Sequence, residues 1–177
     1  MPDYLEPEWI ELEQGETAEL EGGESGWTDQ GSVYADLRNC IAITAYEPDM
    51  GVAGMVHLVA EEMEPEEVTE SIQEMWHDAS SFADPADFNW YAAGGFPGEA
   101  DYTEPFSHGV KSTDRAYLRR VHTDEFFEQM NSSYHSEWLE EEGLMQVRID
   151  LDEESFYIRK IGEPGDSWEN VFHDSQV

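Results

Sequence analysis

The sequence predicts a single α+β domain, residues 1–177, with a largely antiparallel or mixed sheet and two or three helices. Three observations predict it. Short β-favouring runs recur along the chain, at 33–60, 88–96 and 144–161. Helical periodicity appears between them, at 64–80 and from 114 to about 143. No internal repeat or linker divides the 177 residues, a length that can bury one core.

The first third of the chain is predicted to be strands. In residues 1–30, apolar residues alternate with acids, which predicts one or two short acidic strands. Residues 33–46 form the first strongly β-favouring region, and 52–60 form a second strand that is apolar on both faces. The turn between them is "EPDMG", in which Pro48 presets φ and Gly51 can take the positive φ that follows.

The helices are predicted from apolar spacing and end signals. Over 64–80, Pro65 suits a first-turn position and an apolar face recurs at helical spacing. "FADPAD" ends that helix, and 88–96 is predicted to be a buried strand that ends in a double glycine. From 114 to about 143 we expect helix in two pieces, broken near "NSSYHS".

The remaining segments are two predicted strands and two irregular stretches. Residues 97–113 are expected to form a loop. Residues 144–152 and 155–161 alternate apolar and polar side chains, which predicts a closing hairpin. Residues 162–177 form a polar tail that is expected to be peripheral.

The composition is strongly acidic. There are 42 Asp and Glu against 8 Lys and Arg, a net charge of -34, and the acid is spread along the chain. Such a chain repels itself unless salt screens the charges, and at 1 M salt the Debye length falls to roughly 3 Å. The composition therefore predicts a halophile's protein. The alternative is an acidic protein of ordinary salt that mimics nucleic acid or binds basic partners.

The same composition disfavours several classes of partner. Binding to nucleic acid needs a basic patch for the phosphates, and only "RAYLRR" at 115–120 is locally basic. That run is explained either by salt bridges to the acidic surroundings or by docking of an acidic partner. No apolar run approaches the ~20 residues of a membrane span. We expect a soluble protein with no membrane insertion and no export signal, located in the cytoplasm of a high-salt organism or in a virion.

One cysteine and one histidine are placed by local structure. The stretch "CIAITAYEPDMGVAGMVH" begins at Cys40 and ends at His57. If the strands pair about the midpoint of Pro48 and Asp49, Cys40 faces His57, with Cβ atoms about 4.5–5.5 Å apart. A loop longer by two residues sets Cys40 opposite Val59 and leaves His57 a diagonal neighbour, still within side-chain reach.

This spacing permits a Cys–His dyad. An imidazole beside a thiol favours the thiolate, which could attack a carboxamide or ester carbonyl and form a thioester. The alternative is structural, because free Cys is among the most buried residue types and a strand histidine is usually hydrogen-bonded. No tight metal-ligand spacing occurs among the histidines, so no metal is predicted.

The stretch also resembles the chemotaxis receptor-glutamine deamidases, the CheD family, over roughly residues 33–96. The resemblance lies in the Cys-to-His spacing, the "YEPDMG" turn, "AGMVH" at 53–57 and the strand "YAAGGF" at 91–96. The family's Gly-x-Gly-Ser before its cysteine is replaced here by residues 36–39. Its third catalytic member, a Thr six residues before the cysteine, is replaced by Tyr34.

The resemblance implies a CheD-like sandwich and hydrolysis of a protein glutamine side chain to glutamate, without a cofactor. Cys40 would be the nucleophile and His57 the base, and backbone N–H groups near Asn39 and Cys40 would hold the oxyanion. Tyr34, or Asn39 through its amide, would be the third member. The partner would be a chemoreceptor. The alternative is a non-catalytic structural or binding subunit of a larger halophilic assembly, such as a virion, whose partners are its neighbours.

Overall fold

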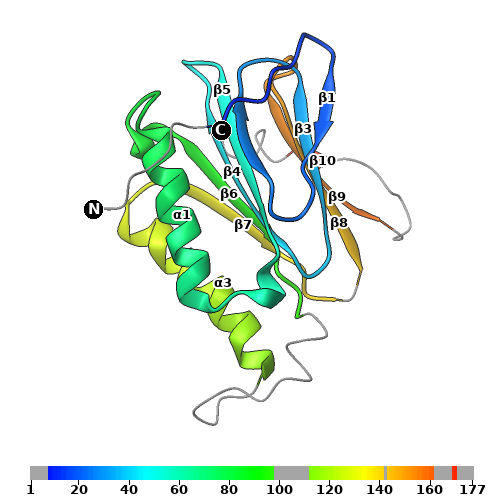
Figure 1. Cartoon of the computed structure of the whole chain (residues 1–177), viewed down its shortest axis with the longest axis vertical. Helices are drawn as coiled ribbons and strands as arrows, with labels where there is room; N and C mark the ends of the chain where they lie inside the picture. The colour runs from blue at the N-terminus through cyan, green and yellow to red at the C-terminus, as the bar shows by residue number, and fades with distance from the viewer. Residues whose placement is uncertain (1–7, 98–111, 142, 162–168, 171–177) are drawn as a thin grey trace.

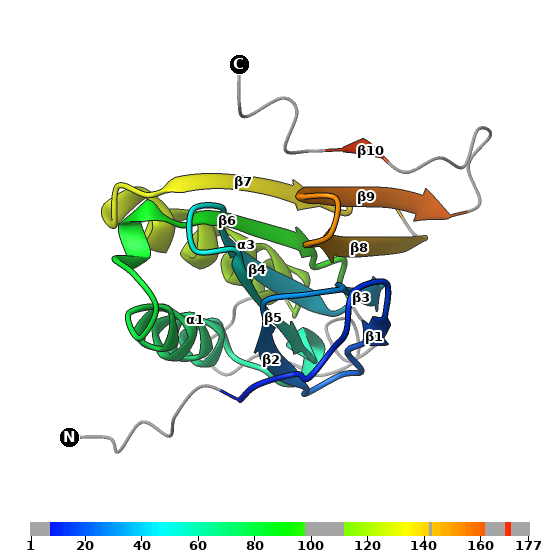
Figure 2. The same ribbon diagram turned by 90° about the horizontal axis from the view of Figure 1, so that it is seen from above.

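Residues 8–97, 112–141, 143–161 and 169–170 are described by the structure, a computed structural model. They form three layers: helices, a first sheet and a second sheet (Figures 1 and 2). The helix-side sheet has the order β2-β5-β4-β6-β7 and the outer sheet the order β1-β3-β8-β9-β10. Both sheets are mixed, because β1 pairs parallel with β3 and β6 pairs parallel with β7. The predicted α+β class is confirmed.

The strands are short, and their bounds are as follows. The helix-side sheet contains β2 (Ser25–Thr28), β5 (Val52–Leu58), β4 (Ile41–Glu47), β6 (Asn89–Gly94) and β7 (Ser133–Trp138). The outer sheet contains β1 (Thr17–Glu19), β3 (Ser32–Leu37), β8 (Leu144–Asp150), β9 (Ser155–Ile161) and β10 (Glu169–Asn170).

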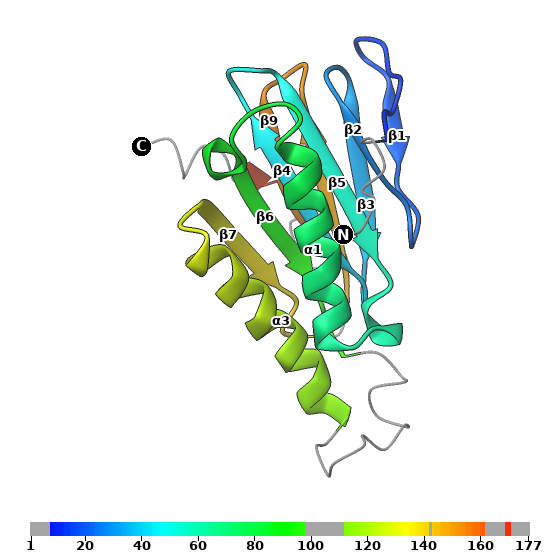
Figure 3. The ribbon, with the colours of Figure 1, turned by 60° about the vertical axis from the view of Figure 1, so that its left-hand side comes forward.

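Two α-helices lie side by side on the face of the helix-side sheet that points away from the outer sheet (Figure 3). They are α1 (Pro65–Ala79) and α3 (Ser112–Gln129), with short 3-10 turns η1 (Ala60–Glu62) and η2 (Pro85–Asp87). Helix α1 begins as predicted: Pro65 is in the first turn, and the Glu67 carboxylate accepts from the Glu64 N–H at 3.2 Å. The stacked rings of Trp76 and Trp90, with centroids 5.2 Å apart, join α1 to β6.

Strand β4 lies at the middle of the molecule, and every one of its residues is buried. Its residues alternate between two cores. Ile41, Ile43 and Ala45 face the helices, whereas Ala42 and Tyr46 face the outer sheet. A strand covered on both sides can be apolar throughout, which explains why "IAITAY" shows little alternation.

The β4–β5 turn fits the prediction at Gly51 and differs from it in length. Gly51 has a φ of 64°, and its N–H donates to the Glu47 carbonyl at 2.9 Å. The register pairs Glu47 with Val52, so the loop contains four residues and is centred on Asp49 and Met50. The predicted alternative with the longer loop therefore describes this hairpin.

The β-favouring region 33–46 is confirmed but divided between two strands: β3 and β4 belong to different sheets and are separated by residues 38–40. One element prediction is wrong. The second helical piece is instead β7, which pairs with β6 from Asn89↔Ser133 to Gly94↔Trp138. Helix α3 ends at Gln129, and Asn131 has a φ of 52°, a conformation that Asn tolerates and that ends a helix. The residues that follow pair with the edge of β6 that β4 does not cover, and this pairing makes them a strand.

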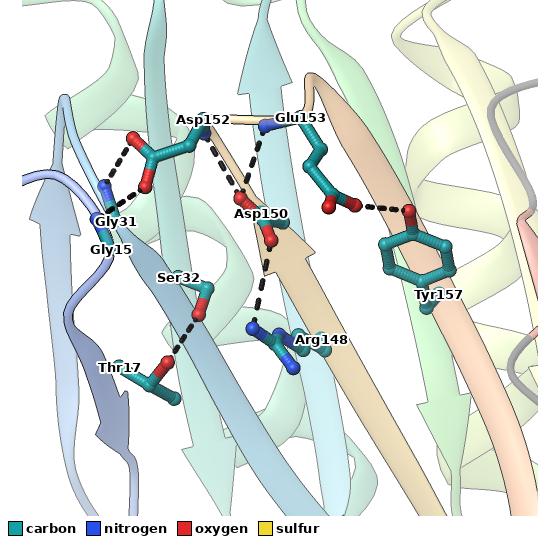
Figure 4. Close-up of polar contacts among 9 residues, drawn as sticks. All are labelled: Gly15, Thr17, Gly31, Ser32, Arg148, Asp150, Asp152, Glu153 and Tyr157. Carbon is teal, nitrogen blue, oxygen red and sulfur yellow. Dashed lines mark hydrogen bonds and ion pairs between the residues drawn. The ribbon is translucent and has the colours of Figure 1, made fainter.

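The closing hairpin is confirmed, since β8 and β9 pair from Leu144↔Ile161 to Asp150↔Ser155. Its turn anchors two other loops (Figure 4). The Asp152 carboxylate accepts from the N–H groups of Gly15 at 2.7 Å and Gly31 at 3.1 Å. The polar tail and the loop at 97–113 lie largely outside the described residues, apart from β10, Pro97 and the start of α3.

Candidate functional site

Cys40 and His57 lie at the same end of the helix-side sheet. Cys40 immediately precedes β4, and His57 is the last residue but one of β5. The register pairs Ala42 with His57 and Ile41 with Leu58, so its continuation sets Cys40 opposite Val59. His57 is therefore the diagonal neighbour of Cys40, at the separation of about 7–8 Å that is usual for such pairs.

Both side chains are on the face that looks toward the outer sheet. Cys40 packs against the inter-sheet core, which includes Ala42 and Met55 at the alternate positions of β4 and β5. His57 follows Met55 by two residues, so it shares this face. Cys40 is half-buried, whereas His57 is 6% exposed. The thiol is thus the accessible member of the pair and the imidazole the enclosed one.

The segment between β1 and β2 fixes His57 from the outer side. The imidazole Nδ1 lies 2.7 Å from the Leu20 carbonyl oxygen. The His57 carbonyl accepts from the Gly23 N–H at 2.7 Å, and the His57 N–H donates to the Glu24 carbonyl at 2.9 Å. A carbonyl can only accept, so Nδ1 carries the proton in this bond and a neutral ring leaves Nε2 as an acceptor.

The Nε2 atom of His57 is buried and has no hydrogen-bond partner among the described residues. Buried polar atoms without a partner are uncommon in folded proteins, and they call for an explanation. This atom has the lone pair that a general base uses. The Cys40 thiol does not donate a hydrogen bond to Nε2. The two side chains therefore share one face of the sheet, but no hydrogen bond joins them.

The environment of Cys40 holds the thiol in its neutral form. Burial raises the pKa of Cys40, the carboxylate of Glu61 raises it further, and the backbone amide of Ala60 acts in the opposite direction. The expectation of a thiolate favoured by the neighbouring imidazole is therefore not met. A neutral thiol must lose its proton during the attack rather than before it.

The backbone on either side of Cys40 is held by the chain that follows β6. The Gly95 N–H donates to the Cys40 carbonyl at 2.8 Å, and the Asn39 amide nitrogen donates to the Pro97 carbonyl at 3.2 Å. Gly94 has a φ of 90°, and a Cβ there would lie 2.3 Å from the Cys40 carbonyl oxygen. The "AAGG" stretch thus has a steric role at the site, since only glycine lets the two backbones approach so closely.

The residues predicted as further site members have these positions. Asn39 directs its amide to the backbone at Phe96 and Pro97, so its side chain holds the loop, and its N–H beside that of Cys40 remains the candidate oxyanion donor. Tyr34 lies on β3 with Val33 and Ala35 facing the inter-sheet core, so its ring is on the other face of the outer sheet. Its hydroxyl donates to the Glu19 carboxylate at 3.2 Å.

A backbone carbonyl occupies the position expected for the third member. Leu20 accepts the Nδ1 proton of His57, and the Leu20 N–H donates to the Tyr34 carbonyl at 2.9 Å. Sequence reasoning missed Leu20, because any residue has a carbonyl and the segment is 37 positions from His57. Tyr34 as a catalytic side chain stays a prediction.

Two further searches concern metals and membranes. Within the described residues, no group of three or more His, Cys, Asp or Glu side chains is arranged to hold a metal ion. No helix in this part of the chain is both long and apolar enough to cross a bilayer.

Comparisons with known proteins find similarity at the level of structure only. No family model and no curated protein matches the sequence. Solved structures with similarity include the hypothetical protein YfiH of Bacillus licheniformis, at 12% identity and a TM-score of 0.31, over 66% of this chain and 50% of that one. YlmD of Geobacillus stearothermophilus is similar at 13% identity and 0.34, over 72% and 59%.

The Neisseria meningitidis protein NMB0706, described by the family name DUF152, is similar at 10% identity and a TM-score of 0.37, over 64% of this chain and 51% of that one. The chain thus spans about half to three fifths of the length of these proteins. TM-scores this low carry no conclusion about activity. None of the three proteins is described as a chemotaxis deamidase, and the resemblance to that family stays a prediction.

Proposed function

We propose that the protein is a cysteine-dependent amidohydrolase of the CheD type, which converts a glutamine side chain of a protein substrate to glutamate. The observation that carries the proposal is the state of His57. Its Nδ1 is held by the Leu20 carbonyl, and its buried Nε2 has no partner among the described residues, on the face that also bears the half-buried Cys40. A base oriented by a third group beside a nucleophile is the arrangement used in covalent catalysis.

The chemistry proceeds in two halves. The Cys40 sulfur attacks the amide carbon and forms an S–C bond, while its proton passes to His57 Nε2. The imidazolium returns this proton to the amide nitrogen, the C–N bond breaks and ammonia leaves, which gives a thioester. Water then attacks the thioester carbon and gives a proton to His57. The C–S bond breaks, glutamate is released, and the sulfur regains its proton from His57.

Two features assist these steps. The Leu20 carbonyl keeps the imidazole in the tautomer that accepts at Nε2 and stabilises the imidazolium. Asn39 and Cys40 directly precede β4, and their N–H groups are the candidates to hold the oxyanion. Because Cys40 and His57 are diagonal neighbours, substrate binding has to bring the thiol and Nε2 into contact.

The proposal is tested by release of ammonia and the accompanying mass increase in a glutamine-bearing chemoreceptor fragment, incubated with the protein in molar KCl. We expect Cys40→Ser to abolish turnover and His57→Gln to lower it by about 10²–10⁴-fold, the usual contribution of a general base. Asn39→Asp and Tyr34→Phe distinguish the remaining candidates. If the Leu20 carbonyl is the third member, Tyr34→Phe should leave turnover unchanged, because the Tyr34 ring is on the other face of the outer sheet. A loss of turnover in Tyr34→Phe would assign the role to Tyr34 instead.

The second candidate function is a non-catalytic subunit of a halophilic assembly, such as a virion. Two observations favour it: the pKa of the Cys40 thiol is raised, and His57 Nε2 has no hydrogen bond to the thiol. A native protein that lacks turnover, carries a thiol unaffected by His57→Gln and remains in a stable complex in molar KCl would support this function over the enzymatic one.

A further inference from the structure

We propose that Arg120 is a positioning residue, which holds the Gly94–Gly95 segment against the Cys40 carbonyl and so sets the backbone that presents the thiol. The inference rests on the proposed function for its catalytic consequence. The physical claim concerns the placement of Cys40 and can be measured whether or not the protein hydrolyses amides.

Arg120 belongs to α3 and is 5% exposed, although it is one of only 8 basic residues in the chain. Its Nε donates to the Gly95 carbonyl at 3.0 Å, and its Nη2 donates to the Leu139 carbonyl at 2.7 Å. Its Nη1 lies 3.5 Å from the Glu140 carboxylate. Burial lowers the pKa of the guanidinium, but an arginine remains charged, so both backbone bonds are charge-assisted.

A short chain of hydrogen bonds leads from Arg120 to the nucleophile. Gly95 receives the guanidinium at its carbonyl and donates its N–H to the Cys40 carbonyl at 2.8 Å. Leu139, the other acceptor, donates its N–H to the Gly94 carbonyl at 2.8 Å. The guanidinium therefore joins the ends of β6 and β7 just where their pairing stops, at Gly94↔Trp138.

Close steric contacts also fix the position of Gly94 and Gly95 against Cys40 and Arg120. The Gly94 Cα lies so close to the Cys40 carbonyl that an added Cβ would be 2.3 Å from its oxygen. The space beside Gly95 is bounded by Arg120 and Trp138, whose atoms would lie 3.4 Å and 3.2 Å from an added Cβ. A shift of the guanidinium would release Gly95, and a shift of Gly95 would move the carbonyl of the nucleophile itself.

The other buried arginines of α3 bind elsewhere. Arg115 is 8% exposed and pairs with the Glu64 carboxylate at 2.9 Å, and Arg119 donates to the Met63 carbonyl at 3.3 Å. These contacts join α3 to the start of α1. Arg115→Met is therefore a matched control for Arg120→Met, because each variant loses a buried guanidinium from the same helix. Of the two, it is Arg120 that binds the Gly95 carbonyl next to Cys40.

The single cysteine allows a direct test. Cysteine with a ¹³C-labelled carbonyl places one resonance in the protein, and its chemical shift reports the hydrogen bond from the Gly95 N–H. In Arg120→Met we expect this resonance to move toward that of a free carbonyl, and Arg120→Lys to restore part of the shift. Arg115→Met should leave the resonance in place, although both Met variants lower the melting temperature.

Turnover adds the catalytic readout. Since small displacements of reacting groups can cost about a hundredfold in rate, we expect Arg120→Met to lower kcat by roughly ten- to a hundredfold with KM unchanged.

An unchanged Cys40 resonance in Arg120→Lys and Arg120→Met would overturn the inference, because Arg120 would then serve stability alone. If Arg120→Met does not fold, Arg120→Gln and Arg120→Lys supply the comparison. A resonance that moves in a protein whose native form lacks amidohydrolase activity supports the positioning role and refutes the proposed function.

Discussion

At the scale of single residues, the pKa of the Cys40 thiol is set by burial and by the three residues of η1. Burial and the Glu61 carboxylate raise its pKa, and the Ala60 amide lowers it. Glu62, the next residue of η1, adds a further negative charge. A thiol in these surroundings is protonated near neutral pH, so its reactivity should increase as the pH rises toward the raised pKa.

Glu61→Gln should therefore lower the pH at which Cys40 becomes reactive. Removing a nearby negative charge makes the thiolate less costly, so the pKa of Cys40 falls. The measurement is the rate of alkylation by iodoacetamide against pH in dilute salt. Glu66→Gln, an exposed acid in the first turn of α1, is the control and should leave the profile unchanged. In molar KCl the difference between native protein and Glu61→Gln should shrink, because salt screens the charge. Identical profiles in dilute salt would show that the Glu61 carboxylate does not contribute to the raised pKa.

At the scale of elements, the end of β6 is the most constrained segment of the site. Gly94 combines a φ of 90° with a contact to the Cys40 carbonyl that leaves no space for a side chain. A non-glycine residue in such a conformation costs about 1–3 kcal/mol before any clash is counted. We therefore expect Gly94→Ala to lower the free energy of unfolding by at least ~2 kcal/mol.

Urea unfolding measures this change, with Gly143→Ala as the matched control. Gly143 has no atom within 4 Å of an added Cβ, so its replacement should be neutral within about 0.5 kcal/mol. Equal midpoints for Gly94→Ala and Gly143→Ala would show that the β6 end relaxes freely. The same variant should also alter the Cys40 carbonyl resonance, since the strain is relieved at that atom.

The elements also show where sequence patterns reach their limit. Helix α1 was predictable because Pro65, the glutamates of its first turn and its apolar face are local signals. Strand β7 was not, because its six residues are held by parallel pairing with β6, whose sequence lies more than 40 positions away. The loop of the β4–β5 hairpin was predictable in part. Its residues predict a turn, but the pairing of Glu47 with Val52 makes the loop two residues longer than the first predicted register.

At the scale of the whole molecule, three arginines of α3 are buried although the chain is strongly acidic. The net charge is -34, yet the arginines of "RAYLRR" are 8%, 1% and 5% exposed. This run therefore tethers α3 to the rest of the fold and does not present a basic surface. The solvent-facing acids repel one another with few exposed cations to offset them, which makes the folded state sensitive to ionic strength.

Stability should increase steeply with salt. We expect the urea midpoint to rise from a tenth molar to several molar KCl, with most of the gain below about 1 M, where the Debye length has fallen to roughly 3 Å. Sucrose at matched water activity is the control, because it favours compact states without screening charge. A urea midpoint that rises equally in sucrose, or not at all in KCl, would count against the prediction of a halophile's protein.

The sequence by itself determined the α+β class, the α1 helix, the Gly51 turn and the placement of Cys40 and His57 at neighbouring ends of a hairpin, because each depends on residues close together in the chain. Only the tertiary structure decided that Leu20 orients His57, that Glu61 and burial hold the thiol neutral, and that Arg120 reaches the Cys40 segment through Gly95. These are contacts of backbone carbonyls and enclosed charges between distant segments, and no pattern of side chains along the sequence encodes which carbonyl meets which donor.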